Sequence, residues 1–383
     1  MKNIIISGFN IDDNNRGTAA LSYGSIEFLR RYHNFDNNMI HSIFLFKKPW
    51  KFRKRKSVIC LQIGSREIII ITHYIWFPEY WLMKRMHLKL PFGALNQLMK
   101  SIDYVAAING GDGFSDIYNE ATFKGRLFET QLAMMYKRPL IILPQTLGPF
   151  KNYGCLDLAE KILKYASYVY VRDLKFEKEL AKMNVSFRLE NDLSYYMLPQ
   201  KVDIDIEEGA IGLNISGLAY SNGFRTLSGK FDNYPNLIMA IIKYFQKKNK
   251  VVYLLAHSYN FQSPEDCNDD LTACKDVYDK LISKKNVRII DRDLTSPEIK
   301  YIISQFSFFI GTRMHANFAA IFTKTPVFGL SYSYKFAGSF EQFGLSENYT
   351  NIVDISKDEI DSIVKRIDKL YATINSSKDF IGV

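Results

Sequence analysis

The chain has 383 residues, which is too long for one ordinary hydrophobic core, so we expect two domains of about 150–200 residues each. Its 47% apolar and 23% charged residues are typical of a soluble globular protein, and no apolar stretch reaches the roughly 18 residues of a membrane-spanning helix. The formal charge of +10 favours an anionic partner: a nucleic acid, an acidic membrane surface or a phosphorylated substrate.

The beginning of the chain and its cysteines bear on the cellular compartment. The first apolar run is too short for the core of a signal peptide and predicts a strand instead. Cys60, Cys155, Cys267 and Cys274 have no metal-ligand spacing, so we expect reduced thiols. The sequence therefore predicts a cytoplasmic protein.

The first half alternates short apolar runs with helical patterns, which predicts βα units around a mostly parallel sheet. Strands are expected at residues 3–8, 39–46, 104–110, 140–145 and 168–173. Helices are expected at 17–31 and near 124–137. Apolar runs on both sides of Gly64 and Ser65 predict a hairpin.

The second half begins after a linker near residues 198–208, where a proline and several acids interrupt the pattern. The alternation then restarts, with strands expected at 210–216, 251–257, 287–290, 308–312 and 326–331. An amphipathic stretch at 356–374 predicts a last helix. This pattern is typical of an α/β protein with a GT-B-like architecture, in which two doubly wound Rossmann-like domains face a cleft.

The predicted domains follow from these breaks. Residues 1–200 form an N-terminal α/β domain, and residues 208–350 form a C-terminal α/β domain. Residues 351–383 form a helix and tail that we expect to pack back on the N-terminal domain.

An insertion at residues 47–92 departs from the pattern. Residues 47–56 carry seven Lys or Arg and no acid, and residues 73–92 mix aromatic with basic side chains, namely Trp76, Phe77, Tyr80, Trp81 and Phe92 with Lys84, Arg85 and Lys89. One interpretation is a solvated charge run beside ordinary core aromatics. The other is a foot on an anionic membrane surface. No RNP, helix-turn-helix or zinc-finger pattern is present, so we expect no nucleic-acid partner.

The strongest candidate site is the segment GTRMHANFAAI at 311–321. An apolar strand ends at Ile310, Gly311 and Thr312 make a turn, and Arg313 and His315 lie in the first turn of a helix. Backbone amides at a helix N-terminus favour an anion, and a guanidinium grips phosphate or carboxylate. The alternative is that Arg313 pairs with a structural carboxylate and His315 is a half-buried residue without a chemical role.

A second candidate, NGGDGFSDIYN at 109–119, follows a buried strand. Its glycines, Gly111 among them, allow a ligand close to the backbone. The carboxylates of Asp112 and Asp116 suit orienting a sugar, acting as a base or holding a metal. Because no third ligand lies nearby, we expect no metal. The alternative is a glycine turn followed by a helix cap.

Three further positions follow predicted strands. Arg172 and Asp173 come after one strand, where they form either a site or a local ion pair. The turn Asn14–Gly17 opens a helix but lacks the GxGxxG pattern, so it predicts no dinucleotide site. His257 ends a strand and is either catalytic or a buried structural residue.

Taken in order, these segments resemble the polysaccharide pyruvyl transferase family. The matching segments are Asn14–Gly17, Asn109–Asp116, Leu143–Phe150, Tyr170–Asp173, Glu190–Tyr195, Gly212–Leu218, Leu254–Asn260, Gly311–Ala320 and Thr325–Gly338. They cover roughly residues 3–345 apart from the insertion. The resemblance implies a GT-B-like fold, phosphoenolpyruvate as the donor and a pair of sugar hydroxyls as the acceptor. It also implies that the N-terminal domain lies on the acceptor side and the C-terminal domain on the donor side.

The resemblance also implies roles for the candidate residues. Arg313 and the backbone of Gly311, Thr312 and Met314 are expected to hold the donor, and His315 to act as the general acid; some relatives carry Leu in place of Met314. Further expected roles are, for the donor, Arg172 and Lys335; for the base, Asp112; and for the acceptor, Asn15, Arg16, Gly111, Asp116 and His257.

The implied reaction places a pyruvate ketal on a precursor of a capsule, an exopolysaccharide or another surface glycan, and releases phosphate. It requires an acid, a base and anion clamps but no cofactor. One alternative is a GT-B glycosyltransferase using a nucleotide sugar, which should carry an acidic ribose-binding residue where this chain has Lys335 and only later Glu341. Another is a non-catalytic binding protein of polysaccharide assembly, which would have no use for Arg313 and His315 together.

Overall fold

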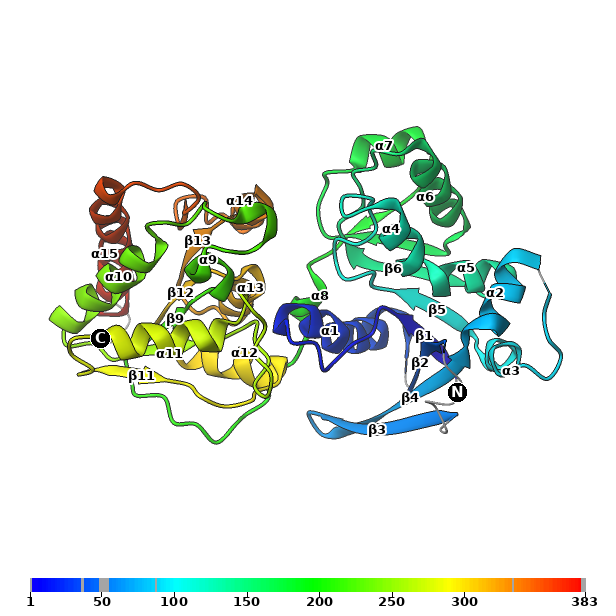
Figure 1. The fold of residues 1–383 in the computed structure, drawn as a ribbon, viewed down its shortest axis with the longest axis horizontal. Helices are drawn as coiled ribbons and strands as arrows, with labels where there is room; N and C mark the ends of the chain where they lie inside the picture. The colour runs from blue at the N-terminus through cyan, green and yellow to red at the C-terminus, as the bar shows by residue number, and fades with distance from the viewer. Residues whose placement is uncertain (1, 36–37, 48–54, 87, 333, 380–383) are drawn as a thin grey trace. The chain divides into compact units, whose positions relative to one another are not determined.

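The computed structural model describes residues 2–35, 38–47, 55–86, 88–332 and 334–379. The chain divides into two compact units, each built around one sheet (Figure 1). Unit 1 comprises Met1–Ile11 and Leu21–Leu198. Unit 2 comprises Asp12–Ala20 and Pro199–Val383.

The sheet of unit 1 has the strand order β3-β4-β2-β1-β5-β6-β7-β8. Its strands are β1 (Ile4–Ser7), β2 (Met39–Phe46), β3 (Lys56–Ile63), β4 (Arg66–Trp76), β5 (Tyr104–Ala107), β6 (Leu140–Gln145), β7 (Tyr168–Val171) and β8 (Arg188–Leu189). All neighbours pair in parallel except β3 and β4, which form the predicted hairpin at one edge (Figure 1). The strand order reverses between β1 and β5, which pair with each other.

Helices cover both faces of this sheet. The side chains of Val169 and Val171 on β7 enter a core with α3 (Ala94–Ser101), α4 (Glu120–Arg126), α5 (Phe128–Met135), α6 (Tyr153–Tyr165) and α7 (Glu177–Lys182). Tyr170, between them in the strand, stacks edge-on against Phe28 of α1 (Arg16–His33). Phe28 also meets Tyr196 of α8 (Leu193–Tyr196). The alternation of a β-strand thus separates two apolar layers.

The sheet of unit 2 is parallel throughout, in the order β11-β10-β9-β12-β13-β14. Its strands are β9 (Ile211–Asn214), β10 (Val252–Leu255), β11 (Val287–Ile289), β12 (Phe308–Gly311), β13 (Val327–Ser331) and β14 (Tyr349–Asn351). The order again reverses beside the first strand, β9, which pairs with β10 and β12.

Two apolar layers also enclose this sheet. Phe308 of β12 faces a core with α9 (Gly217–Ser221), α10 (Tyr234–Lys247), α11 (Asp270–Lys280) and α15 (Lys357–Asp379). Phe309, the next residue, faces a core with α12 (Ser296–Gln305), α13 (Met314–Phe322) and α14 (Tyr334–Gln342). Both units are therefore three-layered, as expected for parallel sheets.

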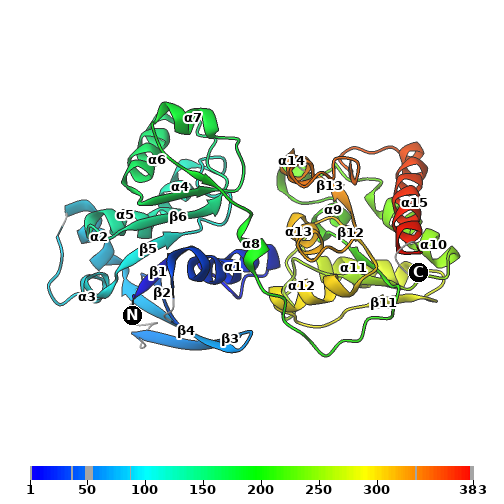
Figure 2. The ribbon, with the colours of Figure 1, turned by 180° about the vertical axis from the view of Figure 1, so that it is seen from behind.

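Most of the predicted strands are present, but three features differ from the sequence-based expectation. Residues 12–20, predicted as part of the N-terminal domain, belong to unit 2. The last helix, α15, was expected to pack on the N-terminal domain and instead packs on α10, with Ile363, Ile367 and Tyr371 in the core of unit 2 (Figure 2). The short strands β8 and β14 were missed because each has only two or three residues and a largely exposed surface.

Two buried histidines join β2 to β4. His41 Nδ1 lies 2.9 Å from His73 Nε2, and the two residues are 7% and 6% exposed. Burial lowers the pKa of both, and that of His73 falls to about 4 with the help of His41 and Lys56. This environment favours the neutral imidazoles.

The buried pair of His41 and His73 predicts that the folded protein loses stability at acid pH. The unfolded chain, with a His pKa of about 6.5, binds protons before the folded chain does, so stability falls as pH drops from about 6.5 toward 4. His73 alone changes the free energy of unfolding by up to about 1.4 kcal/mol per pH unit. Urea unfolding across this pH range should show that the free energy of unfolding falls more steeply in the wild type than in His73→Gln. Parallel losses in the two proteins would show that the pair is not the cause.

Candidate functional site

The loop between β12 and α13 carries the strongest predicted residues. Gly311 ends the strand, Thr312 is fully buried, and Arg313 precedes the first helical residue, Met314. The amides of Thr312 and Arg313 donate to Asn214 Oδ1 at 3.2 and 2.8 Å. We expected these two amides to bind the donor. Because both donate to Asn214, an anion would contact the backbone of α13 from Met314 onward.

The guanidinium of Arg313 is buried and bound to a carboxylate. Its Nη2 lies 2.6 Å from Asp270 Oδ1, and its Nε lies 3.1 Å from the same oxygen. Nη2 also donates to Asn268 Oδ1 at 2.9 Å. Burial alone would lower the pKa of Arg313, but Asp270 and Tyr332, which both interact with the guanidinium, together outweigh burial and raise it. The alternative of a structural ion pair is thus observed.

Asp270 organises more than one loop. Its carboxylate accepts the backbone N–H of Gly217 at 2.8 Å, of Ser258 at 2.9 Å and of His257 at 3.1 Å. The residue itself is completely buried. Asp270 therefore ties the loops after β9, β10 and β12 together. Neither Asp270 nor Asn214 was predicted from the sequence. The one available signal for Asn214 was a polar side chain ending an otherwise apolar strand.

Two histidines lie close to this network. His257 is 4% exposed, and burial together with the charges of His315, Arg313 and Arg16 lowers its pKa well below the usual value. His257 is therefore neutral near pH 7. His315 is half-buried in the first turn of α13, with its ring edge-on to Phe318. A Cβ atom on Gly17 would lie 2.6 Å from His315 Nδ1, so the glycine makes room for this ring.

The turn Asn14–Gly17 contacts unit 2, of which it is a part. Arg16 donates from Nη2 to Asp293 at 2.9 Å, from Nε to the carbonyl of Leu294 at 2.7 Å and from Nη1 to the carbonyl of Asp13 at 2.7 Å. Asn15 accepts the amide of Gly17 and pairs with Ser258. We expected Asn15 and Arg16 on the acceptor domain; they lie instead with His257 and His315, and Arg16 anchors the turn with all three guanidinium nitrogens.

The other predicted residues lie in unit 1. Asn109, Gly110 and Gly111 have φ of 49°, 71° and 80°, so the turn after β5 uses the left-handed region. Asp112 is half-buried and accepts from the hydroxyl of Tyr118 at 3.1 Å. This turn brings one carboxylate to the carboxyl end of the sheet.

Two of the unit 1 predictions have clear structural roles. Asp116 is 7% exposed and accepts the amides of Lys151 and Asn152 at 2.9 and 2.8 Å, which holds the loop before α6. Arg172 Nη1 lies 2.6 Å from Asp192, so the local ion pair that we considered has Asp192 rather than Asp173 as its partner. The acceptor role predicted for Asp116 is not supported by this geometry.

The structure therefore groups the predicted residues into two sets. One set in unit 2 comprises Asn15, Arg16, His257 and Gly311–His315, and the other in unit 1 comprises Gly111, Asp112, Asp116 and Arg172. Lys335 belongs to α14, but its side chain lies outside the described residues. Among the residues that the structure describes, no group of three or more His, Cys, Asp or Glu is arranged to hold a metal ion.

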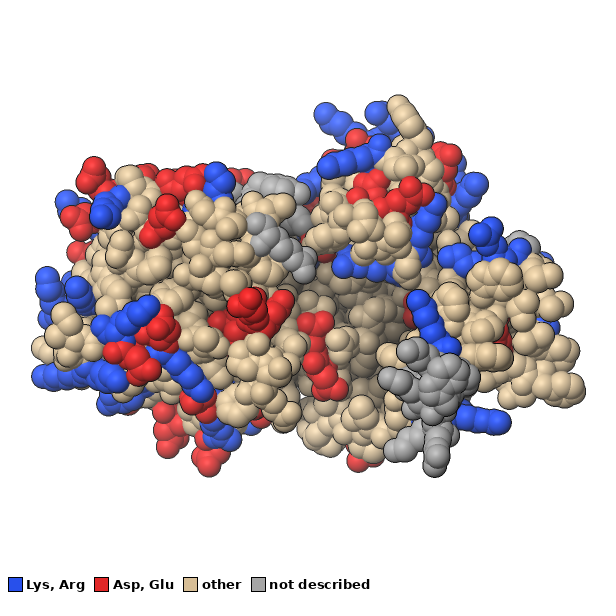
Figure 3. All heavy atoms as spheres, in the orientation of Figure 1, with Lys and Arg blue, Asp and Glu red and all other residues tan. Residues whose placement is uncertain are grey.

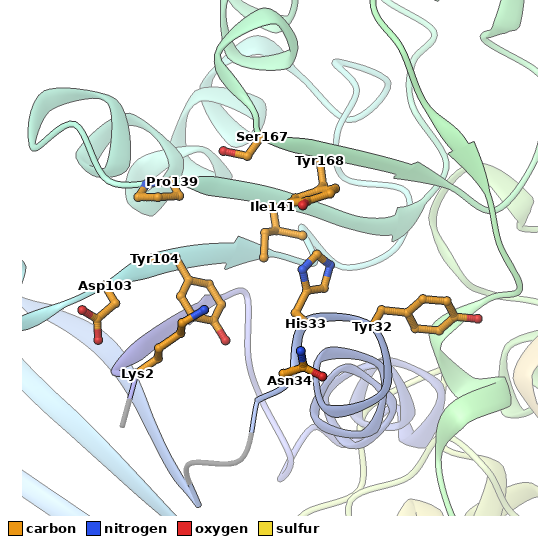
Figure 4. Close-up of a pocket in the computed structure, with 10 residues that line it drawn as sticks. All are labelled: Lys2, Tyr32, His33, Asn34, Asp103, Tyr104, Pro139, Ile141, Ser167 and Tyr168. Atoms are coloured by element: carbon orange, nitrogen blue, oxygen red, sulfur yellow. The ribbon is translucent and has the colours of Figure 1, made fainter.

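A pocket of about 370 Å³ lies elsewhere in unit 1, at the amino ends of β5, β6 and β7 (Figure 4). Tyr104, His33 and Tyr168 line it, with Lys2 and Asp103 (Figure 4). None of the predicted site residues lies there. Ligands of doubly wound folds bind at the opposite, carboxyl ends of the strands, so this pocket does not define the candidate site.

The Asp270 network predicts a large effect on stability. Removing the charge of Asp270 leaves Arg313 buried without a counter-ion, which costs about 3–5 kcal/mol. Asp270→Asn should therefore lower the free energy of unfolding in urea by that amount. Asp276→Asn is the control, since Asp276 lies on the same helix in an exposed pair with Lys280 and should change stability by less than about 1 kcal/mol. Equal effects would mean that the buried pair is not what holds these loops.

Two solved structures share the fold across nearly the whole chain. The UDP-GlcNAc 2-epimerase from Methanocaldococcus jannaschii is 13% identical, with a TM-score of 0.51 over 96% of this chain and 92% of that one. A putative UDP-N-acetylglucosamine 2-epimerase from Listeria monocytogenes is 10% identical, with a TM-score of 0.57 over 97% and 90%. At this identity the likeness concerns the fold alone, and it confirms the predicted GT-B-like class with two Rossmann-like domains.

The sequence profile described as polysaccharide pyruvyl transferase matches residues 15–334. The match begins in the turn that contacts His315 and runs through both units to the start of α14. It includes every predicted site residue except Lys335, which lies one position beyond it. The chain therefore belongs to the polysaccharide pyruvyl transferase family.

Proposed function

We propose that this protein transfers pyruvate from phosphoenolpyruvate to two hydroxyls of one sugar in a capsular, exopolysaccharide or other surface-glycan precursor. The products are a pyruvate ketal and phosphate. Membership of a transferase family supports the reaction class. The observation that carries the proposal is the placement of His315 in the first turn of α13, beside the neutral His257 and the Arg313–Asp270 pair.

The surroundings of α13 suit an anionic donor. The positive end of the helix dipole favours phosphate or carboxylate at its first turn. Asp270 compensates Arg313, and Asp293 compensates Arg16, so the two arginines hold the loops in place without crowding the site with unpaired cations. We assign donor contacts to the turn beginning at Met314, to the guanidinium of Arg313 and to His315.

The chemistry requires a proton donor at carbon. In the proposed sequence the imidazolium of His315 gives a proton to C3 of phosphoenolpyruvate, which makes C2 electrophilic. The first sugar hydroxyl attacks C2 and loses its proton to a base, for which Asp112 is proposed. Phosphate then leaves with the electrons of the C2–O bond and takes up the proton held by the base. The second hydroxyl attacks C2 and passes its proton to the neutral imidazole of His315, so both groups return to their starting states. One acid and one base suffice because phosphate is the leaving group.

The family match favours this reaction over the alternatives drawn from the sequence, which were a glycosyltransferase using a nucleotide sugar and a non-catalytic binding protein. The two epimerase structures share the fold, and a fold by itself does not select a substrate.

The role of His315 can be tested by phosphate release from phosphoenolpyruvate in the presence of lipid-linked oligosaccharides. His315→Gln should lower kcat by about 10²–10⁴-fold, the usual effect of losing a general acid. Gly17→Ala should also lower kcat, because the added Cβ would meet the His315 ring at 2.6 Å.

Two controls match these variants. His33→Gln alters a histidine of unit 1, and Gly125→Ala adds a Cβ where no atom lies within 4 Å; both should keep kcat within about twofold. Normal kcat for His315→Gln at saturating donor, with a raised KM, would make His315 a binding residue instead of the acid.

We further propose that the protein works on the cytoplasmic face of a membrane, held at its surface. Within the described residues no helix is long and apolar enough to cross a bilayer. Around α2 (Phe77–Met86) the large apolar side chains of Trp76, Trp81 and Phe92 are 47%, 46% and 91% exposed. Figure 3 shows a largely uncharged surface over α2 and α3, with Lys and Arg side chains at its edges.

The basic side chains here suit anionic headgroups. Lys84, Arg85 and Lys89 are exposed, and the Lys89 ammonium lies 4.3 Å from the ring of Tyr136. Aromatic groups at headgroup depth with basic neighbours are typical of interfacial binding. Residues 48–54, most of the predicted basic run, lie outside the described residues.

Co-sedimentation with anionic and neutral vesicles tests this association. Changing Lys84, Arg85 and Lys89 together to Gln should weaken binding to anionic vesicles by up to about 100-fold, at about 1 kcal/mol per residue. High salt should have a similar effect on the wild type. The same change at three exposed lysines of α15, Lys357, Lys365 and Lys369, should have little effect. Equal binding of the wild type to both vesicle types would overturn the proposal.

A further inference from the structure

The strand order of unit 1 reverses between β1 and β5, and in doubly wound sheets a ligand binds beyond the carboxyl ends of the strands at that point. Ser7 ends β1 and pairs in register with Ala107, which ends β5. A Cβ on Gly8 would lie 3.2 Å from the backbone nitrogen of Asn109, so the chain segments leaving the two strands pass close together. None of the roles assigned above uses the side chains at this point.

A carboxyl group faces this point from α5. Glu129 lies in the first turn of α5, which packs against β1 and β5. The Ser7 hydroxyl donates to Glu129 Oε2 at 2.9 Å. Burial raises the pKa of Glu129, although its own backbone amide and Ser7 oppose the shift.

Two buried side chains near the same point have polar atoms without hydrogen-bond partners in the described structure. Asn109 is 2% exposed, and neither its Oδ1 nor its Nδ2 has a partner in the described structure. Gln145 ends β6 next to β5; its Nε2 donates to the carbonyl of Ala107 at 2.9 Å, while its Oε1 has no partner there. A buried polar atom without a partner is unfavourable, and a hydroxyl-bearing ligand or its ordered water would recover that cost.

We propose that Glu129 and Ser7, supported by Asn109 and Gln145, form the subsite that binds the acceptor sugar through its hydroxyls. The chemistry of the group selects the ligand class: hydrogen-bond donors and acceptors are mixed among its side chains, so the subsite suits a polyol. An anion such as phosphoenolpyruvate is better served by the first turn of α13. The inference rests on the proposed function, because it assigns the acceptor of that reaction.

Binding of methyl glycosides of galactose, glucose and mannose, followed by saturation-transfer NMR, tests the subsite without requiring turnover. Glu129→Ala should weaken binding of the glycoside recognised by the wild type by about 10- to 100-fold, the loss of one or two buried hydrogen bonds. Glu129→Gln keeps the shape and hydrogen-bonding capacity of a neutral carboxyl group and should stay within about threefold. Glu177→Gln, an exposed first-turn glutamate of α7, is the control and should bind as the wild type does.

Thermal stabilisation by phosphoenolpyruvate separates this inference from the proposed function. It should be the same in the wild type and in both Glu129 variants. If Glu129→Ala binds the glycoside as the wild type does, or loses stabilisation by phosphoenolpyruvate as well, the residue is not an acceptor group and the inference fails. If the wild type binds phosphoenolpyruvate but none of the glycosides, the subsite is refuted while donor use stands.

Discussion

The buried ion pair between Asp270 and Arg313 is the interaction on which the donor region depends. One carboxylate accepts three backbone N–H groups and a guanidinium, and so fixes the ends of β9, β10 and β12 relative to each other. A buried ion pair is a weak source of net stability, since desolvation offsets much of the attraction, but breaking it is costly. Its value here is geometric: it holds the first turn of α13, and His315 with it, in one position.

This constraint changes how the charges of the site are understood. The sequence predicted a donor contact for Arg313 and an acceptor contact for Arg16, and each guanidinium is paired with a carboxylate. In the proposed function, the helix terminus and His315 therefore carry more of the donor recognition. In unit 1 the point where the strand order reverses offers the polar side chains of Glu129, Ser7 and Asn109. The two units thus present different chemistries at the carboxyl ends of their sheets, one suited to an anion and one to hydroxyls.

The strands of both sheets could be predicted from the sequence because short apolar runs and their spacing mark buried segments without information from distant residues. The sequence placed nearly all the strands of both units and the helix that begins at Met314. It could not identify Asp270 as the partner of Arg313, since 43 residues separate them and a carboxylate in a polar segment has no local signature. For the same reason it assigned Asn15 and Arg16 to the wrong unit and gave Asp116 an acceptor role, although that carboxylate holds the loop before α6. The fold was predictable from local patterns, whereas the partners of the site residues depended on tertiary contacts.

The central claim is that carbon from phosphoenolpyruvate ends in a ketal on a glycan. The most direct measurement is ¹³C NMR of the glycan product after incubation with phosphoenolpyruvate labelled at C2. The account predicts that the label appears in a quaternary ketal carbon coupled to the sugar, in amounts equal to the phosphate released, and that His315→Gln abolishes both signals together. Phosphate release with the label recovered as free pyruvate, or a glycan that gains a sugar from a nucleotide donor and no label, would contradict it.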